Sequence, residues 1–216
     1  MIETIREDLK LIAELIEPEC NVLDLGCGEG TFLHYLKNTK RINVTGIEIN
    51  QDKIFKCLSK GLNVVNSNLD EGLALFDKSS FDYVILNETL QVLHHPIDLL
   101  TEMLRVGKTC IVGISNFGHW KTRIDLLFRG HMPVTEAFPF DWYNTPNIHL
   151  CTLKDFELAC RKNNINVINK YFYSKPPLQL SLSDNSTKVK VQNNMFGFNL
   201  FASYGVYVIK SNSAIS

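Results

Sequence analysis

The chain has 216 residues, of which 22 are basic and 23 acidic, so its formal net charge is −1. At roughly 150 residues per domain, this length predicts a single domain over residues 1–216. Hydrophobic residues make up 45% and charged residues 21%, a balance that excludes wholesale disorder. The near-neutral charge argues against a dedicated nucleic-acid binder. No stretch has the roughly 18 apolar residues of a membrane span.

The N-terminal residues and the cysteines both indicate a cytoplasmic protein. Residues 1–8 are acidic and lack the basic start and apolar run of a signal peptide. No Cys-x-x-Cys pair occurs, and a chain of this length buries enough surface to fold without disulfides. We therefore expect reduced thiols and no metal site. The cysteines are Cys20, Cys27, Cys57, Cys110, Cys151 and Cys160.

The first half of the chain alternates between strand and helix patterns. Apolar spacing predicts an opening helix over residues 4–16. Runs of β-branched and leucine residues then predict strands, and the segments between several of them have helical spacing. This alternation is typical of right-handed βαβ units in a parallel sheet with helices on both faces. The expected strands are 22–25, 44–49, 63–65, 81–86 and 109–114, and the expected helices cover Phe32 to Leu36, 52–58 and 96–104.

The second half has a different character. Residues 116–151 are rich in aromatic residues and prolines, and we expect a short helix within an irregular lid or interface segment. A Thr152–Asp155 capping box then predicts a helix to about Lys162. Strands are expected at 166–173 and 200–209, with a flexible polar loop over 174–194 between them. Because no helix separates these two strands, they predict an antiparallel last strand in an α/β sheet of about seven strands.

A glycine-rich turn follows the first strand, in the run Asp24-Leu25-Gly26-Cys27-Gly28-Glu29-Gly30. Glycines allow positive φ angles and let the backbone approach a ligand closely. Glu48 lies twenty residues after Gly28, where a carboxylate can accept hydrogen bonds from the hydroxyls of a ribose. A dinucleotide site would need glycine or alanine at position 31, which is Thr31. A plain tight turn and an NAD site remain the alternatives.

This turn resembles motif I of the class I S-adenosylmethionine-dependent methyltransferases, acid-x-G-x-G-x-G. The resemblance implies their Rossmann-like fold, with S-adenosylmethionine or S-adenosylhomocysteine at the turn. Asp24 would then face the ammonium group of the ligand, and Asn68 would accept from the adenine amino group where these enzymes usually have Asp. The implied cofactor residues are Asp24, Gly26, Cys27, Gly28, Gly30, Glu48, Asn68, Leu69 and Asn87.

Further motifs resemble the MetW family of methionine biosynthesis proteins. They include residues 68–73, 102–108, 116–120, 132–135 and 142–152. The resemblance implies a bacterial protein that supports a MetX-type homoserine O-acyltransferase, its expected partner. The alternative is an S-adenosylmethionine-dependent methyltransferase that acts on a small molecule, whereas an NAD-dependent oxidoreductase is disfavoured by the glycine spacing.

Catalytic residues are not defined by the sequence, and His119, Tyr143 and His149 are weak candidates. His119 follows a strand end and is equally suited to cap a helix or pack beside Trp120. The aromatic residues of 116–151 outnumber what a lid over one small ligand needs, so we expect some of them to contact the acyltransferase. They are Phe117, Trp120, Phe128, Phe138, Phe140, Trp142 and Tyr143.

Overall fold

The computed structural model describes residues 5–135, 137–173 and 197–211. The loop expected at 174–194 lies outside these residues. Within them, no helix is both long and apolar enough to span a membrane.

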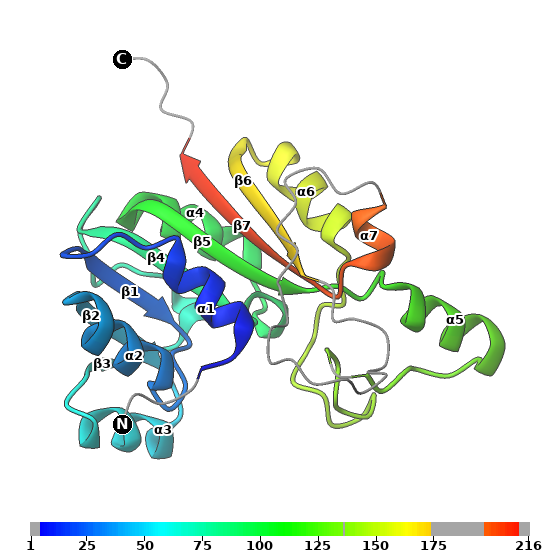
Figure 1. The fold of residues 1–216 in the computed structure, drawn as a ribbon, viewed down its shortest axis with the longest axis horizontal. Coiled ribbons are helices and arrows are strands. Elements are labelled where there is room, and N and C mark those ends of the chain that lie inside the picture. Colours follow the sequence, from blue (N-terminus) through cyan, green and yellow to red (C-terminus); the bar gives the residue numbers. More distant parts are fainter. Residues whose placement is uncertain (1–4, 136, 174–196, 212–216) are drawn as a thin grey trace, which may run out of the picture.

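Seven strands form one sheet in the order β3-β2-β1-β4-β5-β7-β6 (Figure 1). Neighbouring strands are parallel except β7, which is antiparallel to both β5 and β6. This arrangement confirms the predicted α/β fold with an antiparallel last strand. The strands are β1 (Asn21–Leu25), β2 (Asn43–Glu48), β3 (Asn63–Asn66), β4 (Phe81–Asn87), β5 (Gly107–Ser115), β6 (Ile165–Tyr173) and β7 (Tyr204–Ser211).

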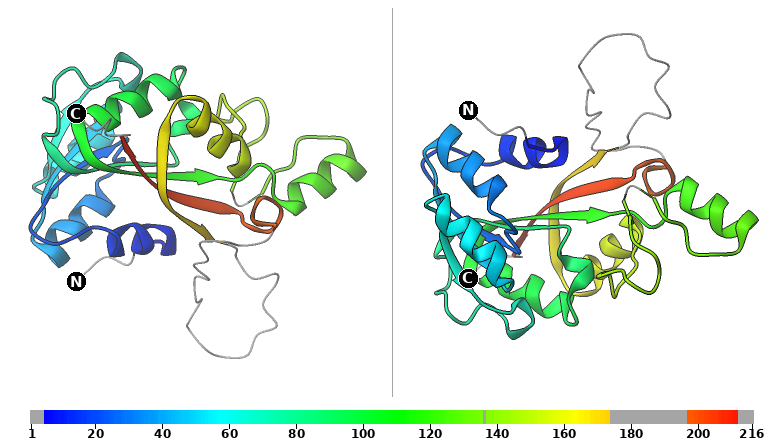
Figure 2. Two further views of the ribbon diagram at one scale, coloured as in Figure 1. Left: turned by 90° about the horizontal axis from the view of Figure 1, so that it is seen from above. Right: turned by 90° about the horizontal axis from the view of Figure 1, so that it is seen from below.

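Helices cover both faces of the sheet. Figure 2 shows α1 and α2 on one face and α4 and α6 on the other. Two separate clusters of buried residues correspond to these faces. The α-helices are α1 (Glu7–Glu14), α2 (Thr31–Lys40), α3 (Gln51–Ser59), α4 (Pro96–Val106), α5 (Trp120–Arg129), α6 (Leu153–Lys162) and α7 (Phe198–Phe201), and the 3-10 helices are η1 (Leu69–Glu71) and η2 (Leu90–Val92).

The apolar stripe of α4 illustrates how the helices hold to the sheet. Leu99, Leu100, Met103 and Val106 are all at most 2% exposed and pack in one cluster with the strands. Burial of each such side chain contributes about 1.5–3 kcal/mol. The predicted capping box of α6 is also confirmed: the Thr152 hydroxyl accepts from the Asp155 amide, and the Asp155 carboxylate accepts from the Thr152 amide.

The last strand begins later than its sequence predicts. Leu200 and Phe201 belong to the helical turn α7, and β7 starts only at Tyr204, so the expected strand over 200–209 was wrong at its start. The buried Asn116 side chain stabilises the turn, because its amide nitrogen donates to the carbonyl oxygens of Asn199 and Ala202 at 3.1 and 2.6 Å. A non-local hydrogen-bond donor therefore overrides the local strand pattern.

Residues 116–151 leave the sheet after β5 and return to it at the start of α6. The Phe117 amide donates to the Cys151 carbonyl at 3.0 Å, so the two ends of this segment meet. Helix α5 extends from the rest of the fold in Figures 1 and 2, and Thr122 is its only buried residue. The predicted short helix within an irregular segment is therefore observed.

Candidate functional site

The three glycines of the turn after β1 all have positive φ angles, 76° at Gly26, 59° at Gly28 and 73° at Gly30. A Cβ at Gly30 would lie 2.5 Å from the Leu62 Cδ1 atom, so this glycine is required by packing. A Cβ at Gly28 would meet nothing within 4 Å. The turn thus leaves open space at Gly28, where a ligand could contact the backbone without a side chain in the way.

Glu48 at the end of β2 holds the turn and is 7% exposed. Its Oε2 atom accepts from the Gly28 amide at 3.0 Å, and its Oε1 atom accepts from the Ile49 and Asn50 amides at 2.9 Å each. A carboxylate has about four acceptor positions. Within the described residues, Oε2 therefore keeps one lone pair for a ligand hydroxyl.

Asp24 is a buried acid, only 5% exposed, and no hydrogen bond or ion pair reaches its carboxyl group from the described residues. Burial raises the pKa of Asp24 to about 7, and the negative charge of Glu48 adds to the rise. Asp24 lines a cavity of about 390 Å³ together with Gly26, Cys27 and Asn87. We call this space the glycine-turn cavity. A buried carboxyl without a partner is suited to a cationic ligand group.

Asn68 and Leu69 lie at the next strand end of the sheet. The Asn68 side-chain oxygen accepts from the Asp70 amide at 3.1 Å and so caps η1, while Leu69 is buried. The oxygen keeps a second lone pair for another donor. Ile49, which the sequence analysis did not name, directly follows Glu48 and is 61% exposed, and its amide donates to Glu48.

A polar network joins the end of β4 to the N-terminal segment. The Asn87 amide nitrogen donates to Asp8 at 3.3 Å, and its oxygen accepts from the Tyr204 hydroxyl. Arg6 pairs with both Asp8 and Glu88. Glu88 has a φ angle of 55°, a conformation that costs an L-residue about 1–2 kcal/mol. Apart from Asn87, sequence reasoning missed this network, because nothing local in the chain links residues 6–8 to β4.

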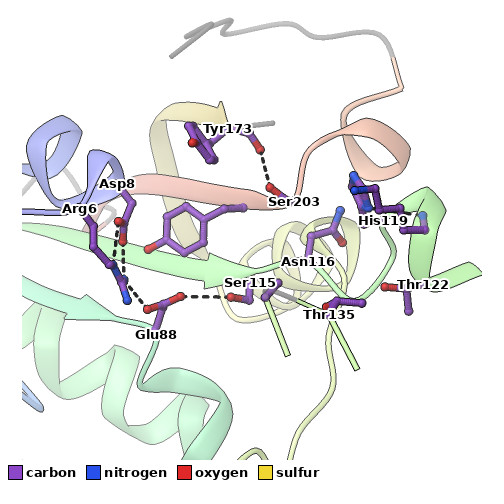
Figure 3. A pocket seen from close by; sticks show the side chains of 13 residues that line it. Arg6, Asp8, Glu88, Ser115, Asn116, His119, Thr122, Thr135, Tyr173 and Ser203 are labelled. Atoms are coloured by element: carbon purple, nitrogen blue, oxygen red, sulfur yellow. Dashed lines mark hydrogen bonds and ion pairs between the residues drawn. The ribbon is translucent and has the colours of Figure 1, made fainter. Parts of the chain in front are cut away.

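Next to this network lies a second cavity, of about 430 Å³ (Figure 3), which we call the α5 cavity. Arg6 and Glu88 line both cavities. The other lining residues come from α1, the end of β5, the first turn of α5, the segment after α5, the end of β6 and the start of β7, and most have polar side chains. They are Asp8, Ser115, Asn116, His119, Lys121, Thr122, Thr135, Ala137, Tyr173, Ser203 and Tyr204.

The three weak catalytic candidates are not brought together. His119 lines the α5 cavity and caps α5, where its Nδ1 atom accepts from the Lys121 amide at 3.4 Å. Burial and the charge of Lys121 lower its pKa. Tyr143 is 71% exposed, its hydroxyl donates to Asp141, and neither it nor the exposed His149 lines the two cavities. Among the described residues, no group of three or more His, Cys, Asp or Glu side chains could hold a metal ion.

The aromatic residues of 116–151 divide into two groups. Phe138 is buried and packs edge-to-face on the half-buried Phe117, while Trp120 is half-buried. The others are exposed, together with several aliphatic side chains of the same segment. We call this exposed set the α5 surface; it comprises Ile124, Leu126, Leu127, Phe128, Met132, Val134, Phe140, Trp142, Tyr143, Ile148 and Leu150.

Several solved structures with a similar fold are described as S-adenosylmethionine-dependent methyltransferases. One from Thermotoga maritima has a TM-score of 0.66 at 18% identity and covers 95% of this chain and 88% of its own. Another from Archaeoglobus fulgidus also has a TM-score of 0.66 at 18% identity and covers 94% of this chain and 91% of its own. At this identity, the similarity establishes the fold.

Sequence similarity is more specific. The chain is 31% identical over 204 residues to the bifunctional methionine biosynthesis protein MetXA/MetW of Rhodopirellula baltica. The match covers 90% of this chain but 33% of the relative, so the chain spans about a third of that protein. The family model of the methionine biosynthesis protein MetW matches residues 6–209. With nearly all of its described residues inside this match, the chain belongs to the MetW family of methionine biosynthesis proteins.

Proposed function

We propose that this chain supports a MetX-type homoserine O-acyltransferase in methionine biosynthesis. The observation that carries the proposal is the Rhodopirellula relative, whose name joins MetXA and MetW in one bifunctional protein. Two activities joined in one bifunctional protein favour a functional link between them. This chain matches the MetW family model over residues 6–209.

We further propose that S-adenosylmethionine or S-adenosylhomocysteine binds at the glycine turn. Three features fit such a ligand: the open space at Gly28, the buried unpartnered Asp24 and the free acceptor position on Glu48. Asp24 would face the ammonium group, Glu48 the ribose hydroxyls, and Asn68 with Leu69 the adenine. Since S-adenosylmethionine is made from methionine, a bound adenosyl ligand would report the end product to the acyltransferase.

Ligand binding is tested by thermal unfolding. Ligand at about 100 times its Kd should add roughly 2.7 kcal/mol of stability, and each kcal/mol moves the midpoint by about 2–4 °C at this chain length. Glu48→Gln should reduce the shift, because its amide nitrogen cannot accept from a ribose hydroxyl. No shift with either adenosyl ligand at millimolar concentration, alongside a shift with NAD, would contradict the assignment.

The α5 surface is the region we propose to contact the acyltransferase. Leu127 and Phe128 are 76% and 77% exposed, and Trp142 is 73% exposed. Large exposed apolar side chains of this kind dominate the binding energy at protein interfaces.

Partner binding is tested by co-purification and by acyl transfer to homoserine with and without this chain. Leu127→Ser should weaken association by about fivefold or more, because loss of an interface anchor costs above roughly 1 kcal/mol. Leu158→Ser on α6 is the matched control, since Leu158 is 49% exposed but lies outside the α5 surface. An acyltransferase that works equally fast alone and does not associate at micromolar concentration refutes the partnership.

A second candidate function is methyl transfer to a small molecule. The α5 cavity favours it, because this cavity adjoins the glycine-turn cavity at Arg6 and Glu88 and has room for an acceptor. S-adenosylmethionine supplies an electrophilic methyl group, and the protein would mainly have to align the acceptor with it. Release of labelled methyl groups above background separates this function from support of the acyltransferase.

A further inference from the structure

The α5 cavity is lined by opposite charges at its two ends. At one end, the single cation Arg6 is shared by the carboxylates of Asp8 and Glu88, which leaves one negative charge in excess. At the other end Lys121 lines the cavity, and no carboxylate of the described residues pairs with it. The first turn of α5 adds its positive backbone amides there. Figure 3 shows the acidic group and the start of α5 on opposite sides of the space.

A buried hydroxyl in the same cavity also lacks a partner. Thr122 is 2% exposed and lines the space, and its hydroxyl makes no hydrogen bond with the described residues. In Figure 3 this oxygen points into the cavity. The oxygen is open to the cavity, since it is not among the fully buried side-chain atoms without a partner in the described residues. A ligand that enters the cavity can therefore hydrogen-bond to the Thr122 hydroxyl.

The lining also limits the side chain of such a ligand. Ala137 is the one aliphatic residue among the thirteen that line the cavity, whereas hydroxyl and amide groups are contributed by Ser115, Thr135 and their neighbours. Most of these groups already have partners, because the Ser115 hydroxyl donates to Glu88 and the Thr135 hydroxyl accepts from the Phe138 amide. The Thr122 hydroxyl is the group that a ligand would satisfy, and a hydroxyl on the ligand side chain can both donate to it and accept from it, whereas a thioether is only a weak acceptor.

We propose that the α5 cavity binds a small α-amino acid with a hydroxyl-bearing side chain. Its ammonium group lies toward Asp8 and Glu88, its carboxylate toward Lys121 and the first turn of α5, and a polar atom bonds to Thr122. The charges of the ligand then complement those at both ends of the cavity. This inference rests on the proposed function in one respect: L-homoserine is the first ligand to test because it is the substrate of the proposed acyltransferase partner.

Isothermal titration of the full chain with L-homoserine tests the proposal, with and without saturating S-adenosylhomocysteine. L-homoserine should bind, and three analogues should bind at least tenfold more weakly. These are its methyl ester, which lacks the carboxylate, 4-hydroxybutanoate, which lacks the ammonium group, and L-methionine, which replaces the hydroxyl by a thioether. Equal binding of L-methionine would overturn the proposed side-chain class, and equal binding of either other analogue would overturn the charge complementarity.

Two variants locate the site. Lys121→Gln should weaken L-homoserine binding about tenfold, and Thr122→Val, which keeps the shape of the side chain, should weaken it several-fold. Lys162→Gln at the end of α6 is the matched control, because it removes a lysine charge away from the cavity. Unchanged affinity in Lys121→Gln, or an equal loss in Lys162→Gln, would refute the assignment to this cavity. A thermal melt of each variant verifies folding.

The same preparations separate this inference from the proposed function. If the chain binds S-adenosylhomocysteine and supports the acyltransferase, but does not bind L-homoserine at 10 mM with or without the adenosyl ligand, only the α5-cavity inference fails. If L-homoserine binds and the acyltransferase is unaffected by the chain, the cavity assignment stands and the partnership fails.

Discussion

The affinity for an adenosyl ligand should depend on pH through Asp24. The pKa of this buried carboxyl is raised to about 7, so at pH 5 only about 1% of the free protein carries the ionised form and at pH 7 about half does. If the ammonium group of the ligand requires the ionised form, the apparent Kd is the intrinsic Kd divided by that fraction. S-adenosylhomocysteine should therefore bind on the order of fifty-fold more tightly at pH 7 than at pH 5, a difference of roughly 2 kcal/mol.

The assay is isothermal titration across this pH range in buffers of different ionisation enthalpy, which also reports the proton released as Asp24 ionises. The α-amino group of the ligand stays protonated below about pH 7.7. Asp24→Asn should bind more weakly at pH 7 and lose the pH dependence. Glu29→Gln is the control, because Glu29 also lines the glycine-turn cavity but its pKa is lowered by Lys56, so it stays ionised throughout. Equal affinity at pH 5 and 7, or the same slope in Asp24→Asn, would refute the reasoning.

The remaining predictions concern stability and the adenine contact. The pKa of Asp24 is raised from 3.8 to about 7 in the folded state, so between these pH values the folded protein holds a proton that the unfolded chain has released. The unfolding free energy of the wild type should therefore fall by roughly 4 kcal/mol as pH rises through this range. Denaturant titrations of Asp24→Asn should show a smaller fall. Gly30→Ala should lower the melting temperature more than Gly28→Ala. Both substitutions add strain at a positive φ angle, but only Gly30→Ala brings a Cβ atom against Leu62. Equal decreases in melting temperature would show that the contact with Leu62 is not what requires glycine at position 30. Asn68→Asp should tighten S-adenosylhomocysteine binding slightly in a competition titration, since a charged acceptor would face the adenine amino group, and unchanged affinity would put the adenine at another position.

Local patterns in the sequence predicted most of the fold. The alternation of strand and helix patterns led to the parallel part of the sheet, and the Thr152 capping box led to the start of α6. Both depend on residues close together in the chain. The error at Leu200 and Phe201 came from a distant residue, because Asn116 bonds the backbone of α7. Such contacts leave no trace in a local pattern.

The residues of the candidate site were predictable only in part. The sequence pointed to the glycine turn and Glu48 because a glycine turn and a ribose-type acid have a fixed spacing along the chain, and the Gly28 amide donates to Glu48 in the structure. Their role in ligand binding stays a prediction. The paired charges of Arg6, Asp8 and Glu88 were not, because they come from two segments that only the folded sheet brings together. The excess of aromatic residues in 116–151 was evident from composition, whereas their division into buried and exposed groups required the packing around Phe138.

The hydrogen bond between the Phe117 amide and the Cys151 carbonyl has a consequence for how this family can diversify. A segment whose ends already meet can be lengthened, shortened or exchanged at small entropic cost, since loop closure depends only weakly on length. The paired residues of β5 and β7 and the whole of α6 lie outside this segment. Changes between residues 118 and 150 would therefore alter the proposed contact surface while the sheet and the glycine turn stay as they are, so this surface and the proposed adenosyl site can evolve separately.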